Sequence, residues 1–75
     1  MNEDQTLLSF GDHVRKLRCN VGLSQEELAS LSDLDRTYIS GIERGKRNLS
    51  LINIVKLASS LNVSLPEIMS FNVEE

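Results

Sequence analysis

Apolar residues recur at intervals of three and four along almost the whole of this chain. Phe10, Val14 and Leu17 show this spacing near the N-terminus, and it is the period of the buried face of an α-helix. A single proline and four glycines in 75 residues are too few for a β-rich fold, which needs many turns. The pattern therefore predicts an all-α fold.

Capping and turn residues divide the pattern into five expected helices, at about residues 7–20, 25–32, 36–44, 51–61 and 65–71. The side chains able to cap helix N-termini are Ser24, Asp35, Ser50 and Ser64. A glutamate follows three residues after Ser24 and after Ser64, which is the sequence of a capping box. Gly22, Asp33 and Gly45 are expected to end the first three helices, because glycine and short carboxylates tolerate positive φ.

A chain of this length holds one domain, here residues 1–75. Apolar residues make up 40% of the sequence and aromatic residues only 4%, so the core must be aliphatic. The residues expected to face inward are Phe10, Val14, Leu17, Leu28, Ala29, Leu31, Ile39, Ile42, Leu51, Ile54, Ala58, Leu61, Leu65 and Ile68.

The second and third expected helices are separated by only about three residues, which forces the sharp corner of a helix-turn-helix. The second helix of such a pair can protrude, and its exposed face here carries hydrogen-bonding groups: Arg36, Thr37, Tyr38, Ser40 and Arg44. Residues 36–48 hold four basic residues and one acidic residue, in a chain of net charge −3. Because salt screening keeps electric fields local, this segment can face an anion. An ordinary solvated face is the alternative explanation.

Residues 25–44 read QEELASLSDLDRTYISGIER and resemble the helix-turn-helix of the Cro/phage-repressor (XRE) family. The family pattern of a polar opening residue, a small residue at the helix crossing and three apolar residues is met by Gln25, Ala29, Leu34, Ile39 and Ile42. The resemblance covers about residues 8–70 and departs at the turn, where Asp33 replaces the usual glycine. It implies a five-helix lambda-repressor-like DNA-binding domain. Residues 34–44, with Arg47 and Asn48, are most similar to the controller proteins of restriction–modification systems.

This resemblance implies a sequence-specific transcriptional regulator of double-stranded DNA, controlling restriction–modification genes including its own. The alternative is an antitoxin-type module that uses the same fold to hold a protein. The sequence contains no recognisable nucleophile–base pair, cofactor loop or metal cluster, so neither an enzyme nor a cofactor is expected. The single cysteine and the lack of a secretory signal or membrane span favour the cytoplasm. The acidic edge at Glu26 and Glu27 is a candidate contact for RNA polymerase.

Side chains around the third helix are assigned to DNA by their chemistry. An arginine fork can bind O6 and N7 of guanine, so Arg36 is the first candidate for reading bases. The other expected base contacts are Thr37, Tyr38 and Ser40, with half-buried packing as an equal alternative for Tyr38. Phosphate contacts are expected from Gln25, Arg44, Lys46, Arg47 and Asn48. Gly41 can read no base and is expected to allow the close approach of backbone or of a partner helix.

Four further residues are given structural roles. The family resemblance implies that Arg18 and Glu43 form an ion pair between the first and third helices. His13 is expected to face solvent or to cap a helix, rather than to bind a metal. Cys19 is expected to be a small packing residue.

A dimer is expected because one recognition helix reads too few base pairs for useful specificity. Residues 50–71 supply an apolar surface beyond the needs of the core, at Ile52, Val55, Met69 and Phe71. The alternative is that this face packs under the first helix or the tail. A two-fold dimer places its recognition helices about 34–36 Å apart, which predicts a pseudo-palindromic operator.

Overall fold

The computed structural model describes residues 3–72, and within that range the chain forms five helices and no strand. They are α1 (Glu3–Asn20), α2 (Gln25–Ser32), α3 (Arg36–Glu43), α4 (Leu51–Leu61) and α5 (Leu65–Ile68). The predicted all-α class is confirmed. Helix α1 begins before the predicted start at residue 7, with acidic side chains in its first turn, where the helix dipole favours them. Helix α5 ends at Ile68 rather than at residue 71.

The four predicted N-caps are confirmed, and each capping side chain accepts a backbone N–H of its helix. Both capping boxes are complete, with Glu27 and Glu67 accepting the N–H of the capping serine. Asp33 adopts the predicted left-handed conformation with φ of 56°. The sequence reading missed Asn62, which ends α4 in the same way with φ of 58°.

The first capping box predicts a sensitivity of stability to acid. The Ser24 N–H donates to the Glu27 carboxylate at 2.9 Å, and this bond lowers the pKa of Glu27. A lowered pKa in the folded state means that the stabilisation is present at neutral pH and is lost as the pH falls through that pKa. Glu27→Gln keeps an acceptor that does not titrate, so its thermal stability should fall less on acidification than that of the unmodified protein.

Thermal unfolding followed by circular dichroism across the acid range measures this difference. Glu26→Gln changes the adjacent exposed residue and serves as the control. If Glu27→Gln and the unmodified protein lost the same stability on acidification, the capping carboxylate would not be responsible.

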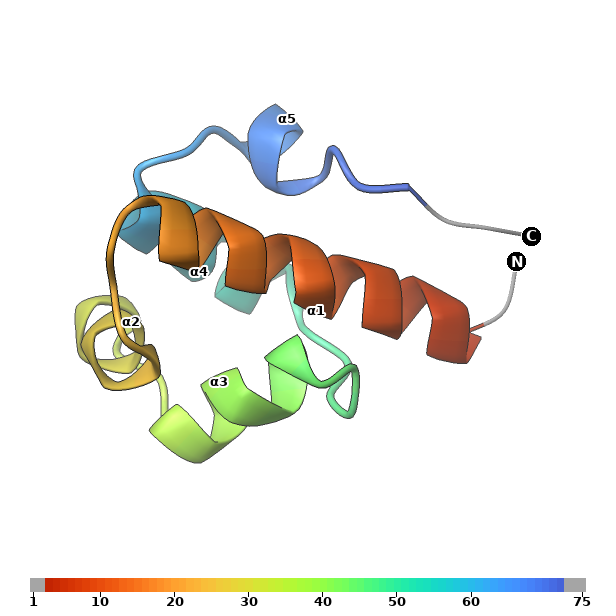
Figure 1. Ribbon diagram of the computed structural model, residues 1–75, viewed down its shortest axis with the longest axis horizontal. Coiled ribbons are helices and arrows are strands. Elements are labelled where there is room, and N and C mark those ends of the chain that lie inside the picture. Colours follow the sequence, from red (N-terminus) through yellow and green to blue (C-terminus); the bar gives the residue numbers. More distant parts are fainter. Residues whose placement is uncertain (1–2, 73–75) are drawn as a thin grey trace.

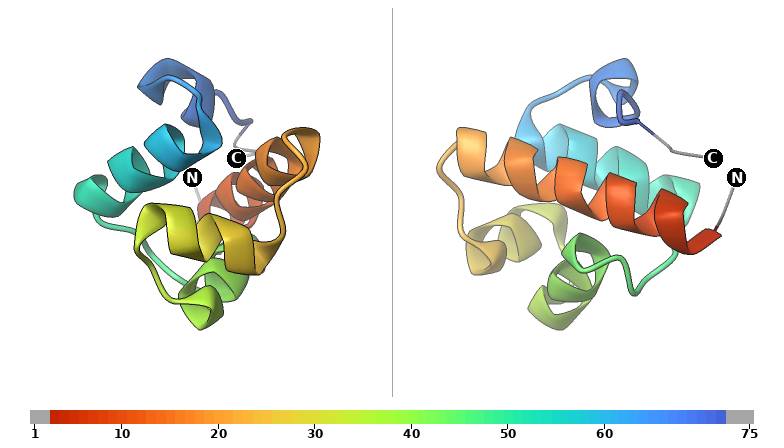
Figure 2. Two further views of the ribbon diagram at one scale, coloured as in Figure 1. Left: turned by 90° about the vertical axis from the view of Figure 1, so that its left-hand side faces the viewer. Right: turned by 45° about the vertical axis from the view of Figure 1, so that its right-hand side comes forward.

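The core lies between α1, α4 and the α2–α3 pair, and α5 closes the side of α1 opposite to α3 (Figure 1, Figure 2). The buried hydrophobic residues are Phe10, Val14, Leu28, Ala29, Ile39, Ile42, Leu57, Ala58, Leu61 and Ile68. All are aliphatic except Phe10, as the composition predicted. Leu17 and Ile54 are partly buried against this cluster.

Four of the packing predictions were wrong. Leu31, Leu51 and Leu65 are exposed rather than inward-facing, and Cys19 is exposed as well. In α2 the buried positions are 28, 29 and 32, so position 31 faces away from the core.

Two buried positions, Ser32 and Leu57, were not among the predicted core residues. Ser32 is buried, and its Oγ donates to the Leu28 carbonyl at 2.7 Å, which satisfies the hydroxyl. Leu57 is fully buried. Apolar residues occupy two faces of α4, so their spacing alone did not define which face lies inward.

Helix α3 packs directly on the backbone of α1 at Gly11. A Cβ atom at this position would clash with the Ile42 carbonyl oxygen and lie 2.9 Å from that of Glu43. Neither obstacle is a flexible side chain, so only glycine allows this approach. The crossing places Glu43 directly beside α1.

His13 joins α1 to α5. Its Nε2 lies 2.9 Å from the carbonyl oxygen of Glu67, in the C-terminal turn of that helix, and its ring is 6.2 Å from that of Phe71. The contact of His13 with the Glu67 carbonyl agrees with the expectation that His13 faces solvent or caps a helix.

Candidate nucleic-acid interface

Helices α2 and α3 are joined by the three residues 33–35 and meet at a sharp corner (Figure 1). The Leu34 N–H donates to the Ala29 carbonyl at 3.0 Å, and the Leu34 side chain packs on the core. The Asp35 carboxylate accepts the Thr37 N–H at 2.9 Å and starts α3. The corner therefore places the first turn of α3 at the outer edge of the molecule.

The predicted base-reading residues lie in two environments on α3. Arg36 and Thr37 are exposed at its start. Tyr38 and Ser40 are half-buried, and Tyr38 packs against the hydrophobic core. The packing alternative for Tyr38 is thus realised in the free protein, while Arg36 and Thr37 are open to a ligand.

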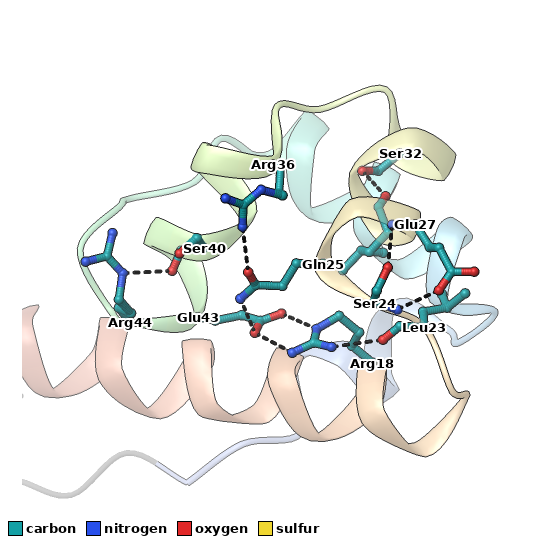
Figure 3. A network of polar contacts seen from close by, with 11 residues as sticks. Arg18, Leu23, Ser24, Gln25, Glu27, Ser32, Arg36, Ser40, Glu43 and Arg44 are labelled. Atoms are coloured by element: carbon teal, nitrogen blue, oxygen red, sulfur yellow. Dashed lines mark hydrogen bonds and ion pairs between the residues drawn. The ribbon is translucent and has the colours of Figure 1, made fainter.

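The ion pair implied for Arg18 and Glu43 is present beneath this surface (Figure 3). Arg18 donates from Nε to Oε2 of Glu43 at 2.7 Å and from Nη2 to Oε1 at 2.9 Å. A third bond runs from Nη1 to the Leu23 carbonyl at 2.9 Å. The side chains are only 14% and 3% exposed, and the hydrogen bond to Glu43 raises the pKa of Arg18. This pair fixes the C-terminal end of α3 to α1.

Gln25 extends the ion pair toward the surface (Figure 3). Its Nε2 donates to Glu43 Oε1 at 3.1 Å, and its Oε1 accepts a bond of 3.4 Å from Nη1 of Arg36. The predicted phosphate contact and the predicted base reader are therefore neighbours in one network. One N–H of the Gln25 amide is used by Glu43, which leaves the second for an outside acceptor.

The basic residues after α3 fold back toward the helix. The Arg44 Nε donates to the Ser40 carbonyl at 3.3 Å, and the Lys46 N–H donates to the Gly41 carbonyl at 2.8 Å. A Cβ atom at Gly41 would lie 2.7 Å from Cγ of Arg47. Gly41 thus makes room for the Arg47 side chain rather than for backbone of the same chain, and the approach of a partner helix stays a prediction.

Asn53 of α4 is a residue that the sequence reading missed. Its Nδ2 donates to the Tyr38 hydroxyl oxygen at 3.1 Å, and the Arg47 guanidinium carbon lies 5.9 Å from the centre of the Tyr38 ring. Nothing in the local sequence singles out Asn53, because the contact joins positions far apart in the chain.

The predicted dimer residues are mostly exposed. Ile52, Val55 and Met69 are 66%, 43% and 48% exposed. Phe71 instead packs edge-on against Phe10, with ring centres 5.3 Å apart. It therefore contributes to the core of its own chain.

None of the helices in residues 3–72 is long and apolar enough to cross a membrane. Within the same residues, no group of three or more His, Cys, Asp or Glu side chains is arranged to hold a metal ion.

The corner between α2 and α3, with the exposed polar start of α3, defines a helix-turn-helix protein. A family model described as Helix-turn-helix matches residues 14–68, and the chain belongs to this family. It is 48% identical to the control protein C.MunI of Mycoplasma sp over 64 residues, which cover 84% of this chain and 86% of that protein.

Solved structures of controller proteins are among those similar to this one. The restriction–modification controller protein C.AhdI from Aeromonas hydrophila superposes with a TM-score of 0.83 and 53% identity, covering 85% of this chain and 97% of that chain. The controller protein C.Esp1396I, crystallised bound to a 25 base pair operator site, gives a TM-score of 0.73 and 45% identity. That match covers 77% of this chain and 76% of the other.

Proposed function

We propose that this protein is a double-stranded DNA-binding transcriptional regulator that controls restriction–modification genes, including its own. The observation that carries the proposal is the exposed start of α3, where Arg36 and Thr37 face outward on a helix anchored by a buried ion pair. The controller proteins at 48% and 53% identity support the biological role. They favour gene regulation over the antitoxin alternative.

The proposed DNA contacts are of two kinds, those to base edges and those to phosphates. Arg36 and Thr37 read base edges in the major groove, where an arginine fork matches guanine. Tyr38 and Ser40 contribute at the edge of this surface. The phosphate contacts come from the start of α2 and from the segment that follows α3, and they add salt-dependent affinity. They are Gln25, Arg44, Lys46, Arg47 and Asn48.

The proposed assembly is a homodimer on a pseudo-palindromic operator, acting in the cytoplasm as a regulator rather than an enzyme. A contact with RNA polymerase is proposed at the acidic edge of α2, where Glu26 is exposed and Glu27 is held by Ser24. Transcription from the operator with purified polymerase tests this contact. Gel-shift with the DNA upstream of the protein's own gene tests the function as a whole.

Arg36→Ala should weaken operator binding by about 1–3 kcal/mol and relax the base preference at one position of each half-site. The reason is the loss of a bidentate contact that is available only for guanine. Titration of the operator and of its single-base variants measures both effects.

The control is Arg15→Ala, which removes an exposed arginine from α1 that pairs with Asp12. It should leave the affinity nearly unchanged. Unchanged operator affinity in Arg36→Ala would refute the assignment of α3 as the reading helix.

A further inference from the structure

The Tyr38 ring has a fixed contact from each of two other segments. Asn53 donates to its hydroxyl from α4 at 3.1 Å. The Arg47 guanidinium lies over the ring at 5.9 Å from its centre, within the range of a cation–π interaction. Tyr38 itself packs on the core. The Tyr38 side chain is therefore held by the core and by Asn53, and the exposed Arg47 side chain lies against its ring.

The aliphatic part of the Arg47 side chain lies in the space left by the missing side chain of Gly41. Its Cγ, Nε and Cδ lie 2.7, 3.4 and 3.6 Å from where a Cβ of Gly41 would stand. Any larger residue would push the stem away from α3. Glycine destabilises a helix interior relative to alanine, and the space that it leaves here is occupied by Arg47.

We propose that Asn53 is a positioning residue for DNA binding, acting through Tyr38 to hold Arg47 against α3 before DNA arrives. This inference rests on the proposed function, in which Arg47 contacts a DNA phosphate. A free arginine loses rotamer freedom when it binds, and a side chain already held loses less. Asn53 thereby raises affinity without touching DNA.

Asn53→Ala isolates this role from helix stability. Only the backbone N–H of Asn53 takes part in the N-cap of α4, donating to Ser50 Oγ at 3.2 Å. Alanine keeps that bond and is the best helix former. The substitution therefore removes the contact to Tyr38 and leaves α4 capped.

The first test needs no DNA, because Tyr38 is the only tyrosine in the chain. Nuclear Overhauser contacts between its ring protons and the Arg47 methylenes should be present in the unmodified protein and weakened in Asn53→Ala. Contacts that are missing in the unmodified protein, or equally strong in the variant, would overturn the proposal. This result stands whether or not the protein binds the expected operator.

The second test is a binding cycle with the single variants Asn53→Ala and Arg47→Ala and the double variant. Asn53→Ala should lower operator affinity about two- to tenfold for each half-site, and should change nothing when Arg47 is already alanine. An equal loss in both backgrounds, or no loss in either, would overturn the role through Arg47. Failure of the unmodified protein to bind would instead refute the proposed function.

Gly41→Ala provides a variant that separates binding from folding. Its melting temperature should stay the same or rise, because alanine favours the helix and the displaced Arg47 side chain is exposed. Its operator affinity should nevertheless fall, and this loss should vanish in the Arg47→Ala background. An unchanged affinity would show that the position of Arg47 does not matter.

Discussion

Arg18→Met should destabilise the fold by about 3–5 kcal/mol, because it leaves a buried carboxylate without its cationic partner. Glu43 is 3% exposed and would keep only the bond from Gln25. Total stability for a domain of this size is on the order of 5–10 kcal/mol, so the variant would lose a large part of it. Denaturant unfolding followed by circular dichroism measures the loss.

Two further variants test whether the loss of the ion pair causes this destabilisation. Arg15→Met removes an arginine of the same helix whose partner, Asp12, is exposed, and it should unfold like the unmodified protein. The double variant Arg18→Met/Glu43→Met replaces the pair by apolar side chains and should recover much of the stability. If Arg18→Met were as stable as Arg15→Met, the pair would not anchor α3.

The secondary structure was largely predictable because its signals are local. The capping boxes at Ser24 and Ser64 and the turn residue Asp33 act within a few positions of the chain, and all three are confirmed. The start of α1 was placed too late because residues 3–6 are all polar, so the apolar spacing that indicates a helix begins only at Leu7.

Packing was less predictable because it depends on which face of each helix meets a neighbour. In α4, Leu51 and Leu57 belong to different faces of one apolar helix, and only the second is buried. Gly11 could not be predicted for the same reason, because the need for glycine comes from the carbonyl groups of α3 that pack against it.

The same contrast between local sequence signals and packing of distant segments applies to the candidate site. The chemistry of Arg36 and Thr37 is visible in the sequence, and they are exposed as expected. The resemblance supplied the ion pair of Arg18 with Glu43, which spacing alone does not indicate. The contact from Asn53 to Tyr38 spans 15 positions and depends on where the fold places the start of α4 relative to α3, so it required the structure.

Val55→Asp should abolish the proposed dimer and lower operator affinity by about 10²–10⁴-fold, because two linked reading helices bind far more tightly than one. Val55 and Ile52 form an exposed apolar surface on α4. Met69 directly follows α5 and is exposed as well, and α5 lies next to α4 in Figure 2. A carboxylate within such an interface would be buried without a partner, at a cost that a small interface cannot offset.

Sedimentation equilibrium and operator titration measure the two effects on the same samples. Val21→Asp is the matched control, because Val21 is similarly exposed, at 49% against 43%, and lies in the α1–α2 connection rather than on α4. It introduces the same charge and should leave both dimerisation and binding intact. An unmodified protein that stays monomeric at high micromolar concentration would contradict the dimer. A Val55→Asp variant that dimerises and binds normally would place the interface elsewhere on the molecule.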